Sequence, residues 1–96
     1  EYRTTSDQIK KIKADIEEFI KQSDLFSKSG DTFTSVKVEQ FAASSIDIRL
    51  ICFTKTSQYL EWMKVRDILA IEIKSIVEKN NASFAFPSTS IYVEKN

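Results

Sequence analysis

The residues that could perform chemistry are few and widely spaced in this sequence. It contains no histidine, which is the commonest metal ligand and the commonest general acid or base near neutral pH. The only cysteine, Cys52, lies in an alternating apolar segment without a neighbour that would lower the pKa of its thiol, so we predict a buried, inert thiol. Arg3, Arg49 and Arg66 stand in unrelated contexts and do not form an anion-binding loop. The sequence therefore predicts no catalytic residue, no metal site and no cofactor.

The segment SKSGD, residues 27–31, contains the only glycine, Gly30. Gly followed by Asp is typical of a turn. A phosphate-binding loop would need several glycines and a Lys-Ser/Thr pair, and a small-molecule site would need several converging polar groups. A free-standing ferredoxin-like module that binds a regulatory ligand is therefore an alternative that only this segment supports, and a small acyl-phosphate hydrolase has still less support.

Charge and composition narrow the class of protein. Fourteen basic and fourteen acidic residues cancel, which argues against nucleic-acid binding and against electrostatic binding to anionic membranes. An apolar share of 42% in 96 residues is enough for one core, so we expect residues 1–96 to form one domain. The sequence has no apolar run of about eighteen residues that could span a bilayer, and a lone cysteine suits a reducing compartment. Because the first residue is Glu1 rather than Met, we expect a fragment of a longer protein.

The elements that must position these residues are arranged around residues 36–53, which predict two strands joined by a tight turn. Alternation at period two points one set of side chains to each face of a sheet. An opposite-charge pair favours the register in which Val38 lies opposite Leu50 and Glu39 opposite Arg49. The expected inward residues are Val36, Val38, Ile46, Ile48, Leu50 and Cys52. The outward polar residues, where an RNA-recognition module would carry stacking aromatics, are Lys37, Glu39, Asp47 and Arg49.

A first helix is predicted before this hairpin. Thr5 and Gln8 have the spacing of a capping box, and the helix is expected to end near residues 23–24. Leu25 and Phe26 are expected to pack under its end. Its charged face is expected to be solvated rather than to bind a ligand. The apolar residues at helical spacing are Ile9, Ile12, Ile16, Phe19 and Ile20.

A second helix is predicted from about Gln58 to Asn80, with Thr56 or Ser57 as its cap. Since Asn tolerates the left-handed conformation, Asn80 and its neighbour are expected to stop the helix. The expected inner stripe consists of Trp62, Val65, Leu69, Ile73 and Ile76, and the expected flank of Met63, Ala70 and Val77.

The second helix also carries apolar residues where a lone domain would prefer charge. Leu60, Ile68 and Ile71 fall on or toward its outer side. On the outer face of the sheet, Ile51 and Phe53 are apolar as well. An apolar stripe at exposed positions can mark a protein contact, so these five residues are the candidate subunit interface.

The predicted order is helix, strand, strand, helix, strand. The segment 84–87, FAFP, breaks regular pairing, and a short last strand follows with Ile91 and Val93 inward. This order fits an α+β fold, a ferredoxin-like two-layer sandwich with two helices on one face of an antiparallel-rich sheet and its first strand missing or reduced. In that topology the first strand is central, so its absence should leave a gap between the last strand and the hairpin.

Three segments carry patterns that occur together in a known family. FAASSIDIRLICF, residues 41–53, places small residues and Ser-Ser-Ile before a strand. NASFAFPSTSIYV, residues 81–93, is similar to a helix end of the form Gly-Ile-x-hydrophobic-Pro-aromatic-Pro-Gln followed by a last strand, although Asn81, Ala85 and Ser88 depart from it. YRTTSDQI, residues 2–9, is similar to the start of the preceding helix. In order and spacing these segments resemble the cytoplasmic domain of the small-conductance mechanosensitive channel family.

The resemblance implies that residues 1–96 are the single C-terminal cytoplasmic α/β domain of a longer membrane protein and that this domain is not an enzyme. In the family, seven copies form a hollow cytoplasmic cage with side portals below the pore, which opens under membrane tension and releases solutes during osmotic downshock. The implied partners are copies of the same chain, forming a heptamer in the intact channel, and the inner membrane, reached through helices outside these residues. No nucleic acid and no small-molecule substrate is implied.

Overall fold

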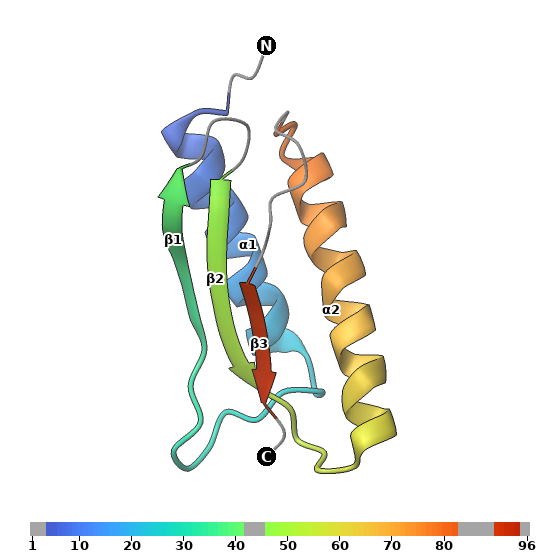
Figure 1. The fold of residues 1–96 in the computed structure, drawn as a ribbon. Helices are drawn as coiled ribbons and strands as arrows, with labels where there is room; N and C mark the ends of the chain where they lie inside the picture. The colour runs from blue at the N-terminus through green and yellow to red at the C-terminus, as the bar shows by residue number, and fades with distance from the viewer. Residues whose placement is uncertain (1–3, 42–45, 83–89, 95–96) are drawn as a thin grey trace.

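Five elements follow one another in the predicted order α-β-β-α-β. The computed structural model describes residues 4–41, 46–82 and 90–94, the last range by its backbone alone. The elements are helix α1 (Ser6–Gln22), strands β1 (Ser35–Phe41) and β2 (Ile46–Phe53), helix α2 (Tyr59–Lys79) and strand β3 (Ser90–Glu94). Helix α1 crosses behind the sheet, and α2 runs along the side on which β3 lies (Figure 1). The predicted α+β architecture with two helices is confirmed.

The sheet has the strand order β1-β2-β3, in which β1 is antiparallel and β3 parallel to β2. The parallel pairing runs from Arg49 opposite Ser90 to Phe53 opposite Glu94. The predicted gap between the last strand and the hairpin is therefore wrong. Unpaired backbone groups at a strand edge are costly, so the crossover through α2 brings β3 directly against the free edge of β2. The result, among the strands described, is a mixed sheet.

The register of β1 and β2 differs from the predicted one. Val38 lies opposite Ile48 rather than Leu50, and the register shifts between residues 38 and 40. Arg49 lies opposite Lys37, so the predicted pairing of Glu39 with Arg49 is wrong as well. Period-two alternation determines which face a residue occupies, and a slip of two residues preserves that face, so alternation does not distinguish the observed register from the predicted one. The irregularity at Glu39 then shifts the pairing by one residue, so that Gln40 lies opposite Asp47.

One apolar core joins both helices to a single face of the sheet. In α1 and α2 the buried residues lie on the predicted inner stripes, except for Val77, which was predicted on the flank and is buried. The other two flank residues, Met63 and Ala70, are exposed, and Trp62 of the inner stripe is only half-buried at the edge of the core. Of the two residues expected under the end of α1, Phe26 is fully buried whereas Leu25 remains partly exposed. The strand residues in the core are Val36, Ile46, Ile48, Leu50 and Cys52, with Val38 packed against them.

Local sequence signals explain the start of α1 and the end of α2 but not the start of α2. The predicted capping box at the start of α1 is present, with the Thr5 side chain accepting a hydrogen bond from the Gln8 backbone at 3.1 Å. The predicted cap of α2 is wrong, because Gln58 occupies the N-cap position and makes no side-chain cap bond. The Thr56 hydroxyl instead accepts from the Gln58 backbone N–H at 3.0 Å, forming a local turn just before the helix. Asn81, with φ 57°, adopts the left-handed conformation expected at the end of α2.

Some predictions fall on parts of the chain outside the described residues. They concern the segment 84–87 and the side chains of Ile91 and Val93. Within the described part, neither helix combines the length and the apolar character that a membrane crossing requires.

Candidate subunit interface

The outer face of α2 exposes the apolar residues that the sequence singled out. Leu60 is 70% exposed, Ile71 64% and Ile68 45%, whereas Leu69, on the opposite face, is fully buried. Leu60 and Ile71 are eleven residues apart, which is about three helical turns, so they lie along one line on the helix. The core formed by the described residues does not include Leu60, Ile68 or Ile71.

The charged residues on the same face pair within the helix. Lys64 lies 3.5 Å from Glu61, and Lys74 lies 3.0 Å from Glu78. Exposed pairs of this kind add little to stability but leave the surface locally neutral. The outer face of α2 therefore combines exposed apolar side chains with balanced charge, which suits a protein contact better than an ionic one.

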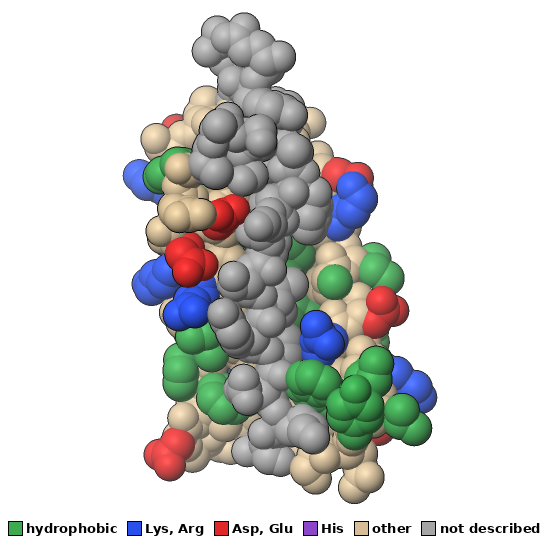
Figure 2. Space-filling model, in the orientation of Figure 1, with side chains coloured by type: hydrophobic (Ala, Val, Ile, Leu, Met, Phe, Trp, Pro, Cys, Tyr) green, Lys and Arg blue, Asp and Glu red, His purple; other side chains and the backbone are tan. Residues whose placement is uncertain are grey.

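The exposed apolar surface continues at the start of α2. Tyr59 is 56% and Met63 43% exposed, and hydrophobic side chains gather at this end of the helix in Figure 2. The Tyr59 ring lies 5.7 Å from that of Trp62, and the Arg66 guanidinium lies 5.0 Å from the Trp62 ring on another side. We call the exposed large apolar residues of this helix the α2 patch; they are Tyr59, Leu60, Met63, Ile68 and Ile71. Sequence reasoning missed the exposure of Tyr59 and Met63. How much the rest of the domain covers these two side chains depends on the residue at which α2 begins, and the sequence did not define that residue.

The second candidate surface lies on the outer face of the sheet. Ile51 and Phe53 are half-buried there, and the Phe33 ring contacts Phe53 edge-on at a centroid distance of 5.4 Å. Phe33 is 52% exposed and extends the apolar surface beyond β2. The sequence offered only one signal for Phe33, a lone aromatic residue in an otherwise polar loop. We call Phe33, Ile51 and Phe53 the sheet patch; it lies on β2 and the loop before β1, so the structure places the two patches on different elements.

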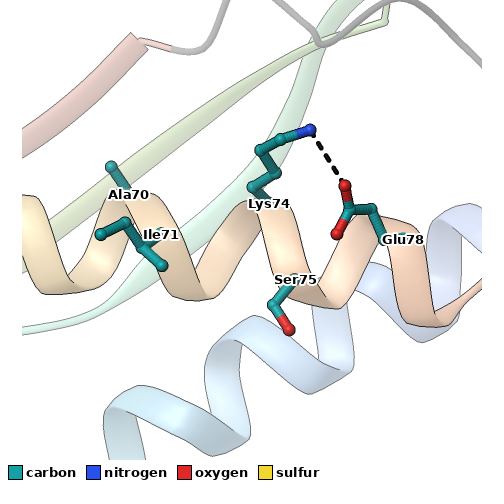
Figure 3. A pocket seen from close by; sticks show the side chains of 5 residues that line it. All are labelled: Ala70, Ile71, Lys74, Ser75 and Glu78. Atoms are coloured by element: carbon teal, nitrogen blue, oxygen red, sulfur yellow. Dashed lines mark ion pairs between the residues drawn. The ribbon is translucent and has the colours of Figure 1, made fainter.

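A shallow groove of about 530 Å³ lies on the outer side of α2. Its described lining comes from this one helix, and in Figure 3 the side chains of Ala70 and Ile71 stand one turn from the ion pair of Lys74 with Glu78. A small-molecule site usually gathers polar groups from several elements around one point. The described lining offers no such convergence. We therefore interpret the groove as a depression in the surface of α2 rather than as a ligand site.

The groups with shifted pKa values are not arranged for catalysis. Burial raises the pKa of the Cys52 thiol to about 12, so the thiol stays protonated and unreactive at neutral pH. Hydrogen bonds from Asn80 and then Lys11 lower the pKa of Asp15, which keeps this carboxylate charged. Among the described residues, no group of His, Cys, Asp and Glu side chains is placed to bind a metal ion.

Comparisons with known proteins agree on one family. The family model described as "Mechanosensitive ion channel MscS, C-terminal" matches residues 1–84. An MscS family protein of Aquifex aeolicus is 35% identical over 94 residues, which is 98% of this chain and 25% of that protein. An MscS family protein of Helicobacter pylori strain 26695 is 51% identical over 59 residues, covering 62% of this chain and 10% of the relative.

A further relative is named for its activity. The low conductance mechanosensitive channel YnaI of Escherichia coli is 41% identical over 59 residues, covering 62% of this chain and 17% of YnaI. The chain thus spans between about a tenth and a quarter of the length of these relatives. No solved structure matches the chain.

Proposed function

Because the chain belongs to the MscS family of mechanosensitive ion channels, we propose that it is a non-catalytic assembly domain of the cage below a tension-gated pore. The intact channel is then a homo-oligomer, with the seven copies that the family resemblance implies. It sits in the inner membrane with this domain on the cytoplasmic side and releases solutes on osmotic downshock. The name of the Escherichia coli relative, a low conductance mechanosensitive channel, supports this assignment.

One observation carries the assembly role: the α2 patch is exposed and lies outside the core that the described residues form. Fully burying a side chain the size of Leu60 or Ile71 contributes roughly 1.5–3 kcal/mol. Contact with a neighbouring subunit would recover much of this free energy. Such a contact needs no catalytic group, in keeping with the protonated thiol of Cys52 and the balanced charges along α2.

The sheet patch is the proposed counterpart of the α2 patch on the neighbouring subunit. A ring is built from heterologous contacts, in which one surface of each subunit meets a different surface of the next. The two patches differ in the way such a contact requires, since one is the convex surface of a helix and the other is the flatter face of a sheet. Phe53, already in contact with Phe33, offers an aromatic anchor at its centre.

Native mass spectrometry of the intact channel that contains this chain tests the proposal. Ile68→Glu together with Ile71→Glu places two charges in the α2 patch, and burying them in a contact without partners is costly. We expect the full ring to be lost or strongly depleted. Both side chains are well exposed within the domain, so circular dichroism of the 96-residue chain should show unchanged helix content.

The matched control adds the same charge to the other helix. Ser6 and Ala14 occupy exposed positions on α1, so Ser6→Glu together with Ala14→Glu should leave the ring intact. A full ring in both double variants would show that the α2 patch is not an interface. Loss of helix content in the Ile68 and Ile71 variant would instead show that these residues stabilise the domain itself.

The alternative of a free-standing ligand-binding module gains little from the structure. Gly30 has φ 66° and serves the turn expected of SKSGD, and the described lining of the groove on α2 comes from that one helix. We propose further that the chain hydrolyses no acyl phosphate and binds no metal. A stoichiometric transition metal in the purified chain, measured by elemental analysis, would overturn the second statement.

A further inference from the structure

The last turn of α2 is held by a side chain from the other helix. The Gln8 side-chain amide donates to the carbonyl oxygen of Asn80 at 3.1 Å and to that of Asn81 at 3.2 Å. In return, the Asn80 side-chain amide donates to Asp15 at 3.0 Å and to the carbonyl of Ile76 in its own helix at 2.9 Å. The last carbonyls of a helix have no partner within it and need donors from elsewhere. We call this arrangement, formed by Gln8, Asp15, Asn80 and the Asn81 carbonyl, the Gln8–Asn80 latch.

The contact with the end of α2 explains why residue 8 is glutamine, whereas its part in the capping box of α1 does not. Its side-chain oxygen accepts the Thr5 backbone N–H at 2.7 Å and so completes the capping box of α1. Glutamate would perform this local role equally well, and its charge would be favoured at a helix N-terminus. Only glutamine also carries an amide that can donate to carbonyl groups. One side chain therefore caps the start of α1 with its oxygen and the end of α2 with its nitrogen.

We propose that the latch joins the first turns of α1 and the last turn of α2 into one cooperative unit that opens and closes as a whole. Donors run in both directions, from α1 to the carbonyls of α2 and from Asn80 to Asp15, so neither helix end can move away without breaking both contacts. The start of α1 and the end of α2 also lie at the same end of the molecule in Figure 1.

The functional consequence of the latch is mechanical. A displacement of the start of α1 is transmitted to the end of α2 through the hydrogen bonds of Gln8 and Asn80. This inference concerns the domain alone and does not depend on the proposed channel role.

Amide hydrogen exchange of the 96-residue chain, followed by NMR, tests the latch. Gln8→Glu keeps the capping-box oxygen but replaces two donors with a carboxylate facing two carbonyl oxygens. Exchange of the amides at the end of α2 should become about tenfold faster or more, the effect of losing one net hydrogen bond. The amides to follow are those of Asn80, Asn81 and Ala82, which bond back into the last turns of α2.

Ser6→Glu is the matched control, because it adds the same charge to the first turn of α1 without touching α2. It should leave the three α2 amides unchanged within about twofold. The latch is refuted if Gln8→Glu has the same small effect as this control. Should Gln8→Glu prevent folding, Asn80→Ala gives the reciprocal test, since coupling between two sites acts equally in both directions. The Gln8 and Ile9 amides at the start of α1 should then exchange several-fold faster, and unchanged rates would also refute the latch.

Discussion

Helices α1 and α2 cover the same face of the sheet, but their outer faces are built differently. All of α1 is described, and Ala14 is the only apolar residue at its exposed positions. The apolar residues at exposed positions of α2 are Tyr59, Leu60, Met63, Ile68, Ala70 and Ile71. A surface helix of an isolated domain normally presents a polar outer face. The outer face of α1 has the composition of a solvent-facing surface, and the apolar outer face of α2 supports the proposal that a neighbouring subunit covers it.

The two helices also use their polar residues differently. On α1, Gln8 and Asp15 make hydrogen bonds to the end of α2, so part of its polar side serves tertiary structure. On α2, Lys64 and Lys74 pair with acidic residues of the same helix. Two polar side chains of α1 thus link the helices, although α1 also contains a pair of the kind found in α2, Lys11 with Asp15.

The largest expected change in stability comes from the buried face of α2 and distinguishes it from the exposed face. Leu69 is fully buried against the sheet, so Leu69→Ala should lower the free energy of unfolding by roughly 2–5 kcal/mol through lost burial and the cavity left behind. Urea denaturation of the 96-residue chain, followed by circular dichroism, measures this change. A loss below about 0.5 kcal/mol would be typical of a surface position and would contradict the assignment of the inner stripe.

A smaller effect is expected from the polar face of α1 as the pH falls. Asp15 has a lowered pKa in the folded chain, chiefly because Asn80 and then Lys11 donate hydrogen bonds to its carboxylate. The stabilisation is complete above the unfolded value of 3.8 and is lost as the pH falls through the folded pKa. Its size should be on the order of 1 kcal/mol, as for one hydrogen bond to a charged group at a partly exposed site.

Denaturation of the parent chain and of Asp15→Asn from neutral pH to about pH 2 measures this contribution. The difference in unfolding free energy between the two chains should be largest near neutral pH and should shrink in acid. A difference that stays constant with pH would show that the charge of Asp15 does not stabilise the fold.

The sequence was sufficient to predict features that depend on periodicity. The inner stripe of α2 around Leu69, the inward face of β2 around Leu50 and the exposure of Ile71 all follow from repeats of 3.6 or 2 residues. The capping box at Thr5 was also predictable, because its partners are three residues apart and the contact is local.

Features that depend on long-range geometry were not predictable in this way. Alternation along β1 is the same in registers that differ by two residues, so the pairing of Val38 with Ile48 rather than Leu50 could not be inferred. The direct pairing of β3 with β2 depends on which strand edge is free, which the order of elements does not state. Gln8 was assigned a local role because its second contact, to Asn80, joins residues 72 positions apart in the sequence.

The smallest expected effect is on the outer face of α2, where the comparison between the helices is sharpest. Ile71 is 64% exposed, so Ile71→Ala removes little buried surface from the isolated chain. Alanine is also the better helix former by a few tenths of a kcal/mol, which offsets part of that loss. The unfolding free energy should therefore change by less than about 0.5 kcal/mol, as for an ordinary surface position.

The same substitution should act differently in the intact channel. There we propose that Ile71 is covered by a neighbouring subunit, so Ile71→Ala should weaken the ring as measured by native mass spectrometry. Ala14→Ser on α1 is the control at an exposed position and should change neither stability nor assembly appreciably. A loss of more than about 1.5 kcal/mol in the isolated chain would show that Ile71 is already packed within the domain, because changes of that size come from buried positions. The outer faces of α1 and α2 would then differ in composition, but neither would be a surface for subunit contact.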